Sequence, residues 1–242
     1  MRRPALLLFA IAFFMEPMAA SAQPRRDSVF DLSLGLPLSD QPRAFGRYAC
    51  GSAGAALGAQ IQGWQDFSFC PPGPDGLHEV YFDYDNTAEQ AARRAGDPVA
   101  AWGMGTSLDY FPIVASALFD DDGVLRAVRI VTDPRPEQRK DPFMLYRPRG
   151  EHYLLQLYLM DRFGMRATDC RDLPLEPGQS PVFGMVTNRV CDKIDAVAKR
   201  HYHIEARFYR RRGEHDVDPD TGQASEGQFV SETRAEIRST AG

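Results

Sequence analysis

Two segments near the end of this sequence alternate residue by residue between apolar and charged side chains. A period of two places the apolar side chains on one side of a β-strand and the charged ones on the other. The pattern therefore predicts a hairpin with one buried and one solvated face. Its apolar positions are Ile204, Ala206 and Phe208, then Thr233, Ala235 and Ile237, and its polar positions are Glu205, Arg207 and Tyr209, then Glu232, Arg234, Glu236 and Arg238.

Matching the apolar faces of the two segments predicts one register, in which Ile204 lies opposite Ile237. The same register places like charges opposite each other on the solvated face, for example Glu205 and Glu236. Because register is set most strongly where a face is buried, we expect the apolar residues to decide it.

The rest of the sequence predicts short strands and a few short helices. Apolar residues 113–119 and 124–132 flank a turn at Asp120–Gly123, which is typical of a hairpin, and residues 79–84 form a third strand. Helices are expected over 87–95, 151–163 and 192–200, although 151–163 would also suit a buried strand. In the last helix Ile194 and Val197 would face inward. These elements indicate an α+β fold of mainly antiparallel hairpins.

The first 22 residues have the three-part layout of a secretory signal peptide. Arg2 and Arg3 precede an apolar run of 11 residues, 5–15, and small residues end the segment at Ala20 and Ala22. We therefore expect cleavage before Gln23. A membrane-spanning helix needs about 20 apolar residues, so a retained anchor is the weaker interpretation. The protein is expected to be soluble and either periplasmic or secreted.

Four cysteines fall into two local pairs, Cys50 with Cys70 and Cys170 with Cys191. An even number of cysteines in an exported chain indicates disulfides, and we expect each local pair to be joined. Each bridge would close a loop of about 20 residues and stabilise the fold by roughly 3 kcal/mol. A four-cysteine zinc site is the alternative, but the short Cys-x-x-Cys clamps typical of such sites are missing.

The clearest change in composition is a proline-rich stretch over 134–150, which is poor material for a helix or a central strand. We interpret it as a connection. The predicted organisation is a signal peptide at 1–22, an N-terminal half at 23–133, the connection at 134–150 and a C-terminal half at 151–242. Each half would be braced by one disulfide.

Charge argues against a nucleic-acid partner. The net charge is −5, and removal of residues 1–22 with Arg2, Arg3 and Glu16 makes it −6. Such a chain has no positive field to gather phosphates. The one dense basic run, residues 210–212, is followed directly by acidic residues that cancel its far field.

Two groups of residues could hold a metal ion, but each has a simpler interpretation. His201, His203 and Glu205 would share one side of a strand, within reach of a single ion. Histidines on a solvated strand are more often plain polar positions, and Arg207 follows on the same side. The acidic run at 216–220, with Glu226, resembles a calcium loop, but the glycine expected at its sixth position is replaced by Thr221. A hairpin tip explains it as well.

The aromatic residues Trp64, Phe67 and Phe69 could form a binding surface, although core packing is the favoured interpretation. No hydrolase elbow, His-Glu-x-x-His motif or phosphate-binding glycine loop occurs in the sequence. We therefore predict no catalytic, cofactor or metal residues. The leading hypothesis is an exported module that binds another protein of the cell envelope, as an inhibitor, immunity factor or assembly accessory. The alternatives are an envelope hydrolase acting on cell-wall or carbohydrate material and a structural subunit of an envelope complex.

Overall fold

A computed structural model describes residues 29–43, 45, 47–51, 58–83, 107–109, 111–133, 149–211, 215–217, 224–226 and 229–240. Four predicted features lie wholly or mostly outside these described residues. They are the signal peptide at 1–22, the helix at 87–95, the connection at 134–150 and residues 218–220 of the acidic run.

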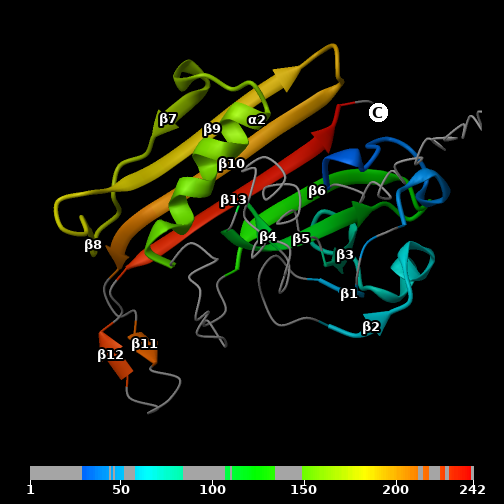
Figure 1. The fold of residues 1–242 in the computed structure, drawn as a ribbon, viewed down its shortest axis with the longest axis horizontal. Coiled ribbons are helices and arrows are strands. Elements are labelled where there is room, and N and C mark those ends of the chain that lie inside the picture. Colours follow the sequence, from blue (N-terminus) through cyan, green and yellow to red (C-terminus); the bar gives the residue numbers. More distant parts are fainter. Residues whose placement is uncertain are drawn as a thin grey trace, which may run out of the picture.

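One antiparallel sheet contains strands from both predicted halves (Figure 1). Its strand order is β2–β1–β3–β5–β6–β13–β10–β9–β7, with β4 also paired to β5 and β8 to β10. The α+β class with mainly antiparallel hairpins, few short helices and two disulfides is confirmed. The strands of the sheet are β1 (Tyr48–Cys50), β2 (Gln60–Ile61), β3 (His78–Phe82), β4 (Ser107–Leu108), β5 (Phe111–Phe119), β6 (Leu125–Thr132), β7 (Cys170–Asp172), β8 (Gln179–Ser180), β9 (Thr187–Asp195), β10 (Arg200–Arg211) and β13 (Val230–Ser239). A separate hairpin joins β11 (His215–Val217) to β12 (Ala224–Glu226).

The β5–β6 hairpin forms as expected around its aspartate-glycine turn. Asp120 accepts hydrogen bonds from the backbone N–H of Asp122 and of Val124, at 3.1 and 2.9 Å, and Gly123 takes the left-handed φ of +73°. Burial alone would raise the pKa of Asp120, but these bonds and the Arg126 guanidinium lower it. The strand expected at 79–84 is β3, which pairs with β5.

The hairpin predicted near the end of the sequence also forms, but its register is shifted by two residues. Tyr202, and not Ile204, lies opposite Ile237. A shift of two leaves every side chain on its original face, so the apolar match survives. On the other face the shift replaces like charges by opposite ones, because Glu205 now faces Arg234. Electrostatic pairing thus distinguishes two registers that burial alone does not.

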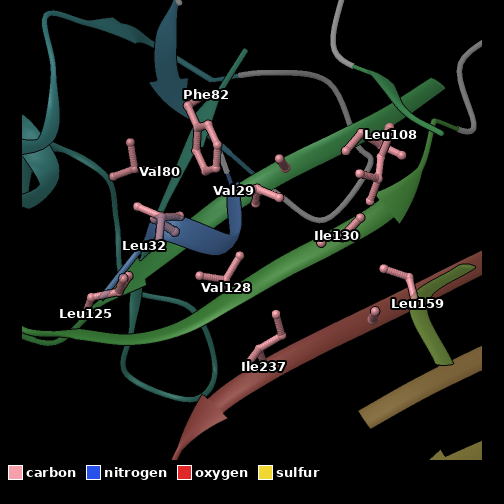
Figure 2. Close-up of a cluster of buried hydrophobic side chains, with 14 of the residues drawn as sticks. Val29, Leu32, Val80, Phe82, Leu108, Leu125, Val128, Ile130, Leu159 and Ile237 are labelled. Carbon is pink, nitrogen blue, oxygen red and sulfur yellow. The ribbon is translucent and has the colours of Figure 1, made fainter. Parts of the chain in front are cut away.

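The strand β13 joins the two sets of strands, because it pairs with β6 on one side and β10 on the other. Its Ile237 lies opposite Val128 of β6 and is 4% exposed. Figure 2 shows both side chains in the core cluster beside Val29 and Leu32 of the short 3-10 segment η1 (Val29–Asp31) and the residue that follows it. The core therefore continues across the boundary between the two predicted halves.

The helix expected at 151–163 is present as the 3-10 turn η5 (Arg149–Leu154) followed by α2 (Leu155–Arg162), which lies across β10 and β13 (Figure 1). Leu155 and Leu159 are fully buried, whereas Leu157 is exposed. The helix is therefore buried on one side only, although Leu157 places an apolar side chain on the solvent side. Phe163, just after the helix, stacks on Tyr202 of β10 with ring centroids 4.6 Å apart.

The prediction of a helix over 192–200 is wrong. Residues up to Asp195 belong to β9, and a turn then leads into β10. Asp195 accepts hydrogen bonds from the N–H groups of Val197 and Ala198, at 3.0 and 2.9 Å, which closes the turn. Ile194 and Val197 do not face inward, since they are 71% and 96% exposed. Pairing of β9 along nine residues of β10 outweighs the weak helical spacing of two apolar side chains.

Two disulfides brace opposite flanks of the sheet. Cys50 at the end of β1 is joined to Cys70, and Cys170 of β7 is joined to its strand partner Cys191 of β9. Cys70 follows η3 (Trp64–Phe69), in which Trp64 and Phe67 are buried and Phe69 is 75% exposed. Core packing thus describes two of these three aromatic residues.

Candidate interaction site

The tight turn between β8 and β9 is the most unusual exposed feature of the described residues. Val182 and Met185 exchange backbone hydrogen bonds of 2.8 and 2.9 Å across it. The two residues between them, Phe183 and Gly184, have φ angles of +49° and +79°. Positive φ at both central positions defines a type I′ turn, which favours asparagine followed by glycine.

Phenylalanine is a poor residue for this backbone conformation. A bulky side chain at positive φ is an outlier, and such strain costs on the order of 1 kcal/mol or more. Burial does not offset that cost here, because Phe183 is 84% exposed. Met185 and Val186 are also exposed, at 55% and 47%. We call Phe183, Met185 and Val186 the apolar tip.

Neighbouring strands fix the apolar tip to the sheet. Val182 is 1% exposed and anchors the base of the turn, and β8 pairs with Arg210 and Arg211 at the end of β10. The Arg210 guanidinium carbon lies 5.7 Å from the centroid of the Phe183 ring, within reach of a cation–π contact. A rigid apolar projection with a positive charge beside it is suited to an apolar depression that has an acidic rim.

The histidines considered as metal ligands lie on the solvated face of β10 and are engaged by carboxylates. Asp192 of β9 contacts His201 at 3.1 Å and His203 at 2.8 Å, and His203 also contacts Glu205 at 3.2 Å. Glu205 in turn accepts a 2.7 Å hydrogen bond from Arg207. Within the described part of the chain, no group of histidine, cysteine, aspartate or glutamate has the arrangement of a metal site.

These contacts tie His203 and its carboxylate partners into one charged group. The hydrogen bond to Glu205, opposed by partial burial and reinforced by Asp192, raises the pKa of His203 to about 9. The bond from His203 lowers the pKa of Glu205. Burial would raise the pKa of Asp192, but both histidines together lower it. A protonated His203 between two carboxylates stabilises the pairing of β9 with β10.

Two convergent carboxylates in a cleft would favour a hydrolase, but the pair that shares a pocket here also contacts an arginine. Asp75 and Glu79 line a pocket of about 250 Å³ together with Arg129. The Arg129 guanidinium lies 2.8 Å from Glu79, 4.0 Å from Asp75 and 3.0 Å from Glu236 of β13. Carboxylates held against a common guanidinium act as its counter-ions, so this pocket does not resemble the acid and base pair of a glycosidase.

The other residues singled out in the sequence lie only partly within the described part of the chain. Arg210 and Arg211 are exposed, and Arg212 lies outside the described residues. Asp216 and Glu226 fall on the β11–β12 hairpin, which agrees with a hairpin and not with the helix pair of an EF-hand. All four cysteines are oxidised and therefore cannot act as nucleophiles.

The sequence patterns described above do not predict the apolar tip. Its signal was present, since residues 182–186 read Val-Phe-Gly-Met-Val directly after Pro181. Turns are normally polar, and a glycine inside a short apolar run marks a place where the backbone reverses with apolar side chains left outside.

Comparison with protein-family models found no match, and neither did comparisons with curated proteins and with solved structures. No helix among the described residues has the length and apolar character needed to cross a membrane.

Proposed function

We propose that this chain is an exported, non-enzymatic module that binds another protein of the cell envelope through the apolar tip. The single observation that carries the proposal is Phe183, which is 84% exposed in a backbone conformation unfavourable for it. A strained and exposed aromatic residue lowers the stability of the free protein. Complex formation is the setting in which its burial offsets that loss.

The partner is a protein with an apolar pocket bordered by carboxylates. The pocket receives Phe183, its walls contact Met185 and Val186, and its carboxylates approach Arg210. Aromatic residues and arginines dominate the free energy of many interfaces, and the tip offers one of each. An inhibitor, an immunity factor and an assembly accessory all act through such a contact in the periplasm or outside the cell.

Site-specific photo-crosslinking tests the proposal. A photoreactive phenylalanine analogue replaces Phe183 in the producing cell, and the same analogue replaces Val197 in a control chain. Val197 is the matched control because it is apolar, 96% exposed and located in the turn at the other end of β9. We expect one discrete covalent adduct from position 183 and none of the same mass from position 197. Identical adducts from both positions, or no discrete adduct from position 183, would refute the proposal.

The substitution Phe183→Asn then separates binding from folding. Asparagine followed by Gly184 is the preferred type I′ sequence, so the free energy of unfolding should be unchanged or rise by up to about 1 kcal/mol. Affinity for the crosslinked partner should fall by at least about 30-fold, as expected when an interface aromatic residue is removed. A variant that binds as tightly as the parent would show that the ring is not the contact.

A further inference from the structure

A second pocket lies between η1, the residues that follow it and one end of the sheet. Its volume is about 230 Å³. The sheet contributes Val128 of β6, Tyr202 of β10 and Ile237 of β13, while Phe163 lies beside the end of α2. Leu34 of the N-terminal segment also lines the pocket. Figure 2 shows how Val29 and Leu32 of the same segment lie over Val128.

Two arginines, Arg162 and Arg200, also line this otherwise apolar pocket. The Arg162 guanidinium carbon lies 4.7 Å from the centroid of the Phe30 ring, which holds the group beside the pocket. Arg162 is exposed and Arg200 is half-buried, so both lie where the pocket meets solvent.

Several arginines of the sheet are engaged by carboxylates. Arg126, Arg129, Arg189, Arg207 and Arg238 are all ion-paired with carboxylates. Neither Arg162 nor Arg200 has a carboxylate within ion-pair distance in the described part of the chain. Two guanidinium groups that have no counter-ion among the described residues, next to apolar volume, form an electrostatic arrangement that a bound anion would complete.

We infer that this pocket binds a small amphipathic carboxylate. The apolar body of the ligand packs against Val128, Phe163 and Ile237, and its carboxylate accepts hydrogen bonds from Arg162 and Arg200. Guanidinium groups match the planar geometry of a carboxylate. An apolar cavity of about 150 Å³ is sufficient for benzene, so 230 Å³ accepts a body of roughly that size with an attached acid group or a short acyl chain.

Titration calorimetry of the purified, disulfide-bonded protein with octanoate tests this inference. Octylamine, with the same chain and the opposite charge, and octyl phosphate serve as comparison probes. We expect saturable one-to-one binding of octanoate that is at least about tenfold tighter than that of octylamine. Arg162→Gln and Arg200→Gln should each weaken octanoate binding by about tenfold, because each removes a charged hydrogen-bond donor. The control Arg43→Gln, an exposed arginine that does not line the pocket, should leave the affinity unchanged.

A steric variant locates the ligand. Leu34→Trp should fill the pocket and abolish octanoate binding while the unfolding transition remains cooperative, since Leu34 is only partly buried. Equal binding of octanoate and octylamine, the absence of saturable binding, or full affinity in both arginine variants would overturn the inference. Tighter binding of octyl phosphate than of octanoate would overturn the choice of a carboxylate and assign the site to a phosphate-bearing ligand.

Discussion

At the scale of single residues, exposure separates side chains that look alike in the sequence. Ile237 and Val197 are both aliphatic, but Ile237 is 4% exposed and Val197 is 96% exposed. We expect Ile237→Ala to lower the free energy of unfolding by about 2 to 5 kcal/mol, through lost transfer free energy and a cavity. Val197→Ala should change it by no more than about 0.5 kcal/mol. Urea denaturation of the two variants measures the difference, and equal losses would contradict the described burial.

The charged neighbour of Ile237 is less solvated than alternation alone predicts. Phe208 is buried and Arg207 is 41% exposed, as expected of the two faces, but the Glu236 side chain is only 15% exposed. It accepts hydrogen bonds of 3.0 and 3.1 Å from Arg129. Sequence alternation placed Glu236 on the solvated face. Alternation defines the side of a strand on which a residue lies, and it does not show how far long neighbouring side chains cover that residue.

At the scale of elements, the group around His203 predicts a pH dependence for the pairing of β9, β10 and β13. His203 is faced by Asp192 on β9, by Glu205 and His201 on its own strand, and by Glu236 on β13. Because its pKa is raised from 6.5 to about 9, the stability it contributes is fully present below pH 6.5 and is lost as the pH rises through about 9.

The substitution His203→Gln isolates this contribution, because glutamine keeps hydrogen-bonding capacity without a titrating charge. In urea unfolding at pH 6 the parent should be the more stable protein, and its advantage should shrink between pH 6.5 and pH 9.5. An advantage that stayed constant over this interval would exclude a charged His203. Below about pH 4 the parent should also lose stability, because the lowered pKa values of Asp192 and Glu205 make their protonation unfavourable for folding.

The sequence predicted elements whose pattern repeats over many residues. The alternation around Phe208 located the last hairpin and its buried face, and the Asp120–Gly123 turn located the first. The alternation could not distinguish two registers that differ by two residues, since both registers satisfy the same period. The observed register depends on which charges meet, and weighing Tyr202 as an inward-facing partner for Ile237 would have favoured it.

Features that depend on distant parts of the chain could not be predicted from local patterns. The strand β9 has no clean alternation, and only its pairing with β10 and β7 explains why 187–195 is extended. The carboxylate-lined pocket unites Asp75 with Arg129, and the arginine-lined pocket unites Leu34 with Arg200. No spacing within the sequence encodes those contacts.

At the scale of the whole molecule, the two disulfides constrain opposite ends of the strand order. Each joins cysteines about 20 residues apart, so replacing either pair with serine should cost roughly 3 kcal/mol. Because the pairs share no strand, the two losses should add. Denaturant unfolding of the two double variants and the quadruple variant measures this. Non-reducing peptide mapping checks the pairing, and any peptide that linked Cys50 or Cys70 to Cys170 or Cys191 would contradict it.

The central position of β13 has a consequence for the order in which the molecule assembles. Synthesis from the first residue to the last delivers β13 after every other strand of the sheet, although it lies between β6 and β10. Until β13 is delivered, both of those strands have an open edge, and contacts so distant in sequence form slowly. The continuous sheet therefore cannot form until the ribosome has synthesised the last strand.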